Sequence, residues 1–132
     1  MPRVALIPGD GIGVEVVREA RRLIEALDES EGLDFEVVEW DLGAERYLRD
    51  GVTITDEEFA ALAEYDAVLL GALGDPRVPG NEHAKDILLG MRFKLDLYVN
   101  FRPCVLLSPE LSPLRDVQSQ LRIETFRENT EG

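Results

Sequence analysis

Apolar strand-like runs alternate with helical patterns along this chain, and that order most constrains its possible folds. The predicted strands span residues 3–8, 33–40, 66–71, 97–103 and 121–127. The clearest helical pattern between them is an apolar face at spacings of three and four, made of Val14, Val17, Ala20, Ile24 and Leu27. Strands joined by short helical connections favour a parallel sheet, so we expect a doubly wound, three-layer αβα fold.

Further helices are predicted over residues 42–49, after an N-cap at Thr55, and over residues 82–94. Thr55 with Glu58 three residues later has the pattern of a capping box. The last predicted strand reaches almost to Gly132 with no helix after it to cover it. We therefore expect an incomplete fold.

The charge balance excludes several classes of partner. Asp and Glu total 27 against 14 Lys and Arg, a formal net charge of -13 that repels nucleic acid and anionic lipid. No apolar run approaches the roughly 20 residues that a membrane span requires, so no membrane partner is expected. Cys104 is the single cysteine and no secretory signal is visible, which favours a cytoplasmic protein.

A glycine-rich loop over residues 9–13 follows the first predicted strand and precedes the first helix. It departs from the Rossmann dinucleotide fingerprint, because Val14 occupies the position of the third glycine and the next acidic cluster comes late, at residues 39–41. A P-loop is excluded because no Gly-Lys-Ser/Thr follows. Two interpretations stay open, a tight turn that needs glycine or a backbone that approaches a ligand closely. Asp10 is a candidate cap for the following helix.

Three arginines lie at or near the ends of predicted elements: Arg92 in the helix over residues 82–94, Arg102 in the next strand and Arg127 in the last strand. A guanidinium binds carboxylate in a planar, bidentate way and keeps its charge, so two of them on adjacent elements would clamp a dicarboxylate. A solvated arginine or a surface ion pair is the alternative. His83 and Cys104 form neither a nucleophile–base pair nor a zinc spacing.

Four segments resemble one enzyme family in the family's own order. They are PGDGIGVEV at residues 8–16, LGALGDP at 70–76, MRFKLDLYVNFRP at 91–103 and FRENTEG at 126–132. They are similar to the β-decarboxylating dehydrogenases, the isocitrate and isopropylmalate dehydrogenase family. The resemblance covers this whole chain but only the opening portion of the family's length. It implies an isopropylmalate-dehydrogenase-like fold that is not a Rossmann fold.

Members of this family oxidise a malate-type 2-hydroxy acid with NAD or NADP and decarboxylate the product with the help of Mg²⁺ or Mn²⁺. The resemblance implies that Arg92, Arg102 and Arg127 bind the malate carboxylates. It also implies that Gly11, Ile12 and Gly13 form the cofactor-side loop, with NAD the expected cofactor. We expect no catalytic residue and no metal ligand in this chain, because the family's lie beyond Gly132.

The resemblance also predicts domains and assembly. Residues 1–99 are expected to belong to a larger cofactor-side domain, and residues 100–132 to begin a smaller substrate and dimerisation domain. The full-length protein is expected to be a homodimer, and the 132-residue chain alone to be inactive.

Specificity is expected to depend on the helix before Arg92. Isocitrate enzymes carry Ser and Asn where this chain has Asp86 and Leu88, and homoisocitrate enzymes tend to carry Arg where it has Leu89. Leu88 and Leu89 resemble the isopropylmalate enzymes of leucine biosynthesis, in which apolar groups meet the isopropyl substituent. Lys85 stands where many of those have Glu, so tartrate or D-malate remains an alternative substrate. Homoisocitrate and isocitrate, the substrates of other members of the family, also remain alternatives. A non-catalytic small-acid binding or interaction domain is the alternative class.

Overall fold

The computed structural model describes residues 1–115, 117 and 121–131. The chain forms two compact units, Met1–Met91 and Arg92–Gly132, and each is described by itself.

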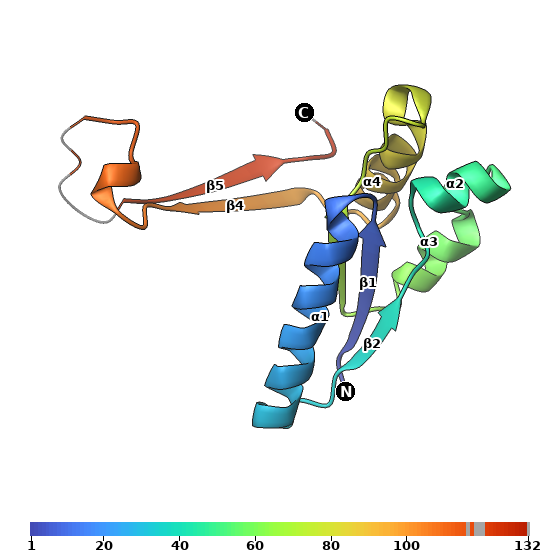
Figure 1. Ribbon diagram of the computed structural model, residues 1–132, viewed down its shortest axis with the longest axis horizontal. Helices are drawn as coiled ribbons and strands as arrows, with labels where there is room; N and C mark the ends of the chain where they lie inside the picture. Colours follow the sequence, from blue (N-terminus) through green and yellow to red (C-terminus); the bar gives the residue numbers. More distant parts are fainter. Residues whose placement is uncertain (116, 118–120, 132) are drawn as a thin grey trace. The chain divides into compact units, whose positions relative to one another are not determined.

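The first unit is built on a parallel three-stranded sheet (Figure 1). Its strands, in the order β2-β1-β3, are β2 (Glu36–Glu39), β1 (Arg3–Gly9) and β3 (Ala67–Ala72). Leu6 of β1 pairs with Glu39 on one side and with Leu69 on the other. Ala5, Leu6 and Ile7 are fully buried, as expected for a central parallel strand covered on both faces. The predicted α/β fold is therefore confirmed, in partial form.

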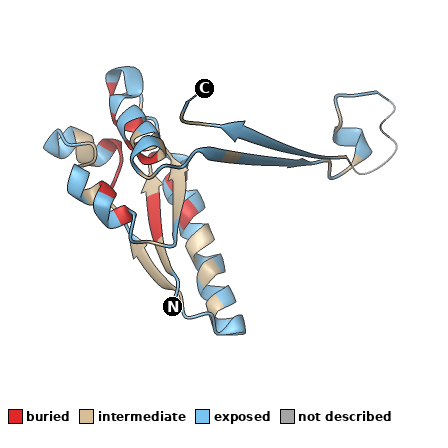
Figure 2. Ribbon diagram, turned by 180° about the vertical axis from the view of Figure 1, so that it is seen from behind, coloured by how far each residue is buried: buried red, intermediate tan, exposed pale blue. Residues whose placement is uncertain are grey.

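Helices cover both faces of this sheet. They are α1 (Ile12–Glu31), α2 (Ala44–Asp50), α3 (Asp56–Leu62) and α4 (Glu82–Lys94), with a short 3₁₀ turn η1 (Pro79–Asn81). Helix α1 packs on β1 and β3, and Figure 1 shows α2 and α3 on the other side of the sheet. Buried residues gather on β1 and on the inward sides of the helices (Figure 2).

The predicted capping box at the start of α3 is confirmed. Thr55 Oγ1 accepts a hydrogen bond from the Glu58 backbone N–H at 3.2 Å, and the Glu58 carboxylate accepts one from the Thr55 N–H at 2.8 Å. Arg46 of α2 donates to both oxygens of the same carboxylate, at 2.6 and 3.0 Å. Burial raises the pKa of Glu58, but the hydrogen bonds from Arg46 and Thr55 outweigh it and lower the pKa overall.

The second unit contains an antiparallel pair of strands, β4 (Val99–Val105) and β5 (Arg122–Glu128), with a 3₁₀ turn η2 (Pro109–Leu111) between them. Phe101 lies opposite Phe126, and their ring centroids are 4.9 Å apart. The expectation of parallel pairing therefore holds for the first unit only. No α-helix among the described residues links β4 to β5, and parallel neighbours need a long crossover connection, usually an α-helix.

Candidate functional site

The glycine-rich loop joins β1 to α1 and is a tight turn that needs glycine, while close approach to a ligand stays a prediction. Gly9 and Gly11 adopt positive φ angles of 69° and 51°, which favour glycine. A Cβ on Gly13 would overlap the backbone of Pro8 and Ala72, so this glycine lets α1 pack closely on the sheet. Gly11 has open space around it and Ile12 is 63% exposed. Those two residues are the part of the loop that a ligand can reach.

Asp10 lies at the centre of this loop with its carboxylate buried. Oδ1 accepts from the Ala44 N–H at 2.6 Å, and Oδ2 accepts from the Gly74 N–H at 2.7 Å. His83 Nε2 lies 2.7 Å from Oδ2. Burial raises the pKa of Asp10, but the hydrogen bonds from Ala44, His83 and Gly74 outweigh burial and lower the pKa overall.

The prediction that Asp10 caps α1 is wrong. Helix α1 begins after Gly11 with no side-chain cap, and the Asp10 carboxylate instead binds the first N–H of α2, at Ala44. The Asp10 backbone N–H donates to Ala72 O at 2.6 Å, which ties the loop to the end of β3. The carboxylate is thus held by donors from the start of α2, the segment after β3 and helix α4.

In the order β2-β1-β3, the second and third strands lie on opposite sides of β1, so the direction in which strands are added reverses at β1. Open α/β sheets bind ligands outside the carboxyl ends of their strands at such a reversal point. Here the reversal lies between β1 and β3, where Asp10 bonds to Gly74 just beyond β3. The glycine-rich loop therefore occupies the place where this architecture favours a ligand.

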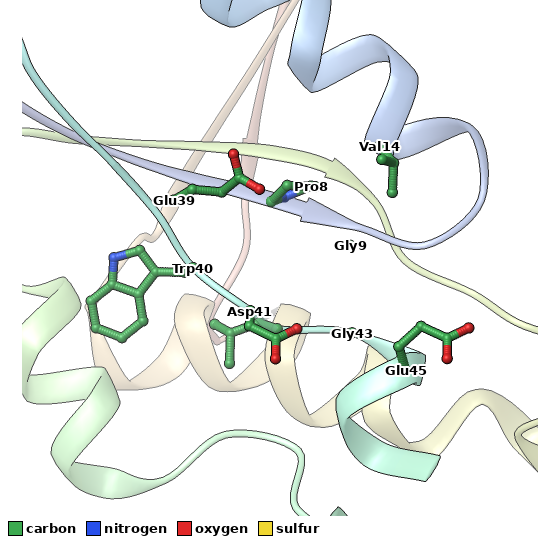
Figure 3. Close-up of a pocket in the computed structure, with 9 residues that line it drawn as sticks. Pro8, Gly9, Val14, Glu39, Trp40, Asp41, Gly43 and Glu45 are labelled. Atoms are coloured by element: carbon green, nitrogen blue, oxygen red, sulfur yellow. The ribbon is translucent and has the colours of Figure 1, made fainter. Parts of the chain in front are cut away.

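A cavity of about 410 Å³ lies on the other side of β1, at the ends of β1 and β2 (Figure 3). Carboxylates of Glu39, Asp41 and Glu45 lie around it, and none of the described residues that line it is basic. Glu45 is ion-paired with Arg77. This acidic lining disfavours a phosphate group there.

The antiparallel register places Arg102 and Arg127 on one face of the β4–β5 pair. Arg127 lies opposite Asn100, and Arg102 lies opposite Thr125. Opposite residues share a face and alternate residues return to it, so the two arginines are diagonal neighbours, with Cα atoms roughly 7–8 Å apart in such pairs. Arg102 Nε donates to Asn100 Oδ1 at 3.0 Å.

This face, called the arginine face below, carries no carboxylate among its described residues. Its members are Asn100, Arg102, Cys104, Ile123, Thr125 and Arg127. The charged partners Arg122 and Glu124 lie on the opposite face, where they form an ion pair. Neither Arg102 nor Arg127 is ion-paired with any residue that the structure describes. In a chain of net charge -13, two arginines on one face without an acidic neighbour on it make this face a candidate for anion binding.

Glu128 stabilises the turn directly after Arg127. Its carboxylate accepts from Thr130 Oγ1 and from the Thr130 N–H, both at 2.6 Å, and from the Glu131 N–H at 2.9 Å. These bonds lower the pKa of Glu128 to about 2. The Glu-Asn-Thr-Glu run thus holds the end of β5 in a defined turn.

Helix α4 carries the predicted specificity residues. Its buried side is formed by His83, Ala84, Ile87 and Met91. Leu88 is half-buried and Leu89 is 43% exposed, with Lys85 exposed one turn before Leu89. Arg92 lies half-buried near the end of α4. Whether Arg92 and the two leucines meet the arginine face stays a prediction.

Sequence reasoning missed the role of His83. The side chain is fully buried, and its ring stacks on the ring of Tyr47 with the two ring centroids 6.1 Å apart. Its hydrogen-bond partner Asp10 is 73 residues away in the sequence. No local pattern marks a contact of that separation. A histidine on the apolar side of a helix was the only available signal.

No three His, Cys, Asp or Glu side chains lie close enough to hold a metal ion in the described part of the chain. These residues therefore do not fit a metal site of their own. Within the same residues, no helix is both long and apolar enough to cross a membrane.

Comparison with known proteins identifies the family. The family described as isocitrate/isopropylmalate dehydrogenase matches residues 3–132. The 3-isopropylmalate dehydrogenase of Corynebacterium kroppenstedtii is 48% identical over 131 residues, which cover 98% of this chain and 38% of that protein. The enzyme of the same name from Leifsonia xyli is 42% identical, over 98% of this chain and 37% of its own length.

A solved structure gives the same result. The β-decarboxylating dehydrogenase of Thermococcus kodakarensis, in its apo form, superposes with a TM-score of 0.70 at 30% identity. The match covers 100% of this chain and 35% of that one. The chain thus spans little more than a third of the length of the relatives it matches. It belongs to the isocitrate/isopropylmalate dehydrogenase family.

Proposed function

We propose that this chain is the N-terminal portion of an NAD-dependent enzyme that oxidises and decarboxylates a malate-type 2-hydroxy acid. The favoured substrate is 3-isopropylmalate, which would place the protein in leucine biosynthesis in the cytoplasm. Residues 1–99 would belong to the larger cofactor-side domain, and residues 100–132 would begin the substrate and dimerisation domain of a homodimer. The observation that carries this proposal is the carboxylate-free arginine face.

Arg102 and Arg127 would bind the substrate carboxylates, with Arg92 as the third cation. Bidentate guanidinium contacts fix the orientation of a dicarboxylate and hold its hydroxyl-bearing carbon at one place. Their fixed positive charge also stabilises negative charge that develops on the acid during the reaction. Because the described residues of this face include no carboxylate, both guanidiniums would be free to bind the substrate.

Gly11, Ile12 and Gly13 would form the cofactor-side loop. NAD bound beside these residues would supply the hydride acceptor for oxidation of the hydroxyl-bearing carbon. The accessible backbone at Gly11 and the exposed Ile12 fit close approach of a dinucleotide, and Gly13 keeps the loop seated on the sheet. Mg²⁺ or Mn²⁺, when bound, would polarise the hydroxyl and keto oxygens, with ligands from the rest of the full-length protein.

Leu88 and Leu89 would meet the side chain of the substrate. Two apolar side chains favour an isopropyl group over a third carboxylate, because a carboxylate placed against them loses its hydrogen bonds. Exposed Lys85 on the same helix supports tartrate or D-malate as the second candidate, because its ammonium group would favour a more polar acid.

The substrate class is tested with the full-length protein. The expected result is the highest kcat/KM on 3-isopropylmalate, in a panel with isocitrate, D-malate and tartrate, with NAD and Mn²⁺ present. Higher kcat/KM on isocitrate or tartrate would overturn the assignment. No turnover of any of the four acids would favour the non-catalytic binding domain instead.

A further inference from the structure

We propose that Asp10 and His83 form a buried positioning pair that holds the cofactor-side loop in place from helix α4. The pair joins residues 9–13, where the dinucleotide would bind, to the helix that carries Leu88 and Leu89. Its consequence for catalysis rests on the proposed function. Its structural part does not.

The hydrogen bonds of Asp10 come from three separate segments of the chain. Ala44 begins α2, Gly74 follows β3, and His83 lies in the first turns of α4. Asp10 is 6% exposed and His83 is fully buried, so water does not replace a lost partner easily. A buried carboxylate that loses a donor is costly, which makes each of the three segments a constraint on the loop.

The direction of the central bond follows from the chemistry of the two groups. An ionised carboxylate only accepts, so His83 Nε2 carries the hydrogen and donates to Asp10 Oδ2 across 2.7 Å. His83 Nδ1 is buried and has no partner among the described residues. The imidazole therefore has one polar bond, and Asp10 is its partner.

A glycine at position 43 makes room for the Asp10 carboxylate. A Cβ on Gly43 would lie 2.7 Å from Asp10 Oδ1, so glycine there lets the start of α2 approach. Asp10 is also the immediate neighbour of Gly11 in the chain. A shift of the Asp10 side chain is thus passed directly to the accessible part of the loop.

The first test compares kinetic constants in the full-length protein. His83→Leu removes the donor, and we expect the KM for NAD to rise about 10-fold, because a misplaced loop weakens dinucleotide binding. His83→Gln keeps an N–H donor at a similar reach, and we expect it to restore the KM for NAD to within about 3-fold. The KM for the hydroxy acid is expected to change less than the KM for NAD.

Ile87→Ala is the matched control, since Ile87 is fully buried one turn further along the same side of α4. It should lower the melting temperature and leave the KM for NAD unchanged. An equal rise in KM for Ile87→Ala and His83→Leu would overturn the pair, since general loss of stability would then explain both. Failure of His83→Gln to restore the KM would overturn it as well.

A second test is independent of catalysis. The amide hydrogens of Ala44 and Gly74 donate to Asp10 and are expected to exchange slowly in the wild-type full-length protein. We expect His83→Leu to speed their exchange by about 10-fold or more, and Ile87→Ala to affect them no more than other amides of the sheet. Unchanged exchange in His83→Leu would overturn the pair. If His83→Leu accelerates this exchange but the wild-type protein oxidises none of the four hydroxy acids, the pair is supported and the proposed function is wrong.

Discussion

Arg102 and Arg127 show how strand register turns two scattered cations into one surface. In the sequence, nothing distinguishes either arginine from a surface arginine of a chain with 27 acidic residues. Register places both on the face that lacks acids, while Arg122 pairs with Glu124 on the other face. Neither charge therefore has an acidic neighbour on that face.

Arg102→Lys in the full-length protein is expected to lower kcat/KM on the hydroxy acid at least about 10-fold, and Arg127→Lys likewise. Lysine keeps the charge but loses the bidentate fork. Arg122→Lys, on the opposite face of the same strand pair, is the matched control and should retain wild-type kinetics. Wild-type turnover in both test variants would remove the carboxylate clamp.

Asp10 predicts an acid-dependent loss of stability. Its pKa in the folded protein lies below the ordinary 3.8, because the bonds from Ala44, His83 and Gly74 outweigh the effect of burial. The stabilisation is thus fully present above about pH 4 and is lost as the pH falls through the folded pKa. The free energy of unfolding of the full-length protein, measured with urea from pH 6 to pH 3, should fall more steeply for wild type than for Asp10→Asn.

Asp10→Asn should also be less stable at neutral pH, since an amide nitrogen would face the N–H donors of Gly74 or His83. Identical slopes for the two proteins between pH 4 and 3 would contradict the role of this carboxylate.

At the scale of elements, most helices and strands follow from local pattern, but their pairing does not. Residues 82–94 were predicted as a helix and form α4 with those bounds. The predicted strand over residues 33–40 shortens to Glu36–Glu39, because Asp34 turns the chain at a φ of 55°. Whether β4 and β5 pair parallel or antiparallel depends on the connection between them. The periodicity of each strand does not predict that connection.

The start of α3 gives an element-scale prediction. Thr55→Ala removes the acceptor of the Glu58 N–H and should cost about 1 kcal/mol of stability. Thr55→Ser keeps the hydroxyl and should cost much less. Thermal melts of the full-length protein compare the two variants, and equal losses would show that the hydroxyl contributes nothing.

At the scale of the whole chain, apolar side chains remain exposed on both units. On α1, Ile12, Val16, Leu23 and Leu27 are between 44% and 63% exposed. On the β4–β5 pair, Phe101 is 48% and Phe126 is 69% exposed. Exposed apolar groups in such number usually mean association with other surfaces. They fit a chain that spans little more than a third of its relatives' length.

Residues 1–132 alone are therefore expected to show no dehydrogenase activity and low stability. The reaction needs groups that polarise the hydroxyl and keto oxygens and move protons, and the chain spans little more than a third of its relatives' length. The purified chain is tested by NADH formation with 3-isopropylmalate and Mn²⁺, together with a thermal melt. Solubility is a poor criterion, because a net charge of -13 favours it. Measurable turnover, or a sharp cooperative melt in dilute solution, would contradict this prediction.

The sequence alone was enough for the features that depend on neighbouring residues. Periodicity predicted the α/β order, Thr55 and Glu58 predicted a cap, and the four motifs predicted the family. The contacts of Asp10 span 34, 64 and 73 residues and required the folded chain, because crossovers decide which loops meet at the sheet edge. The shared face of Arg102 and Arg127 likewise required the register, since a shift of one residue would move one arginine to the opposite face.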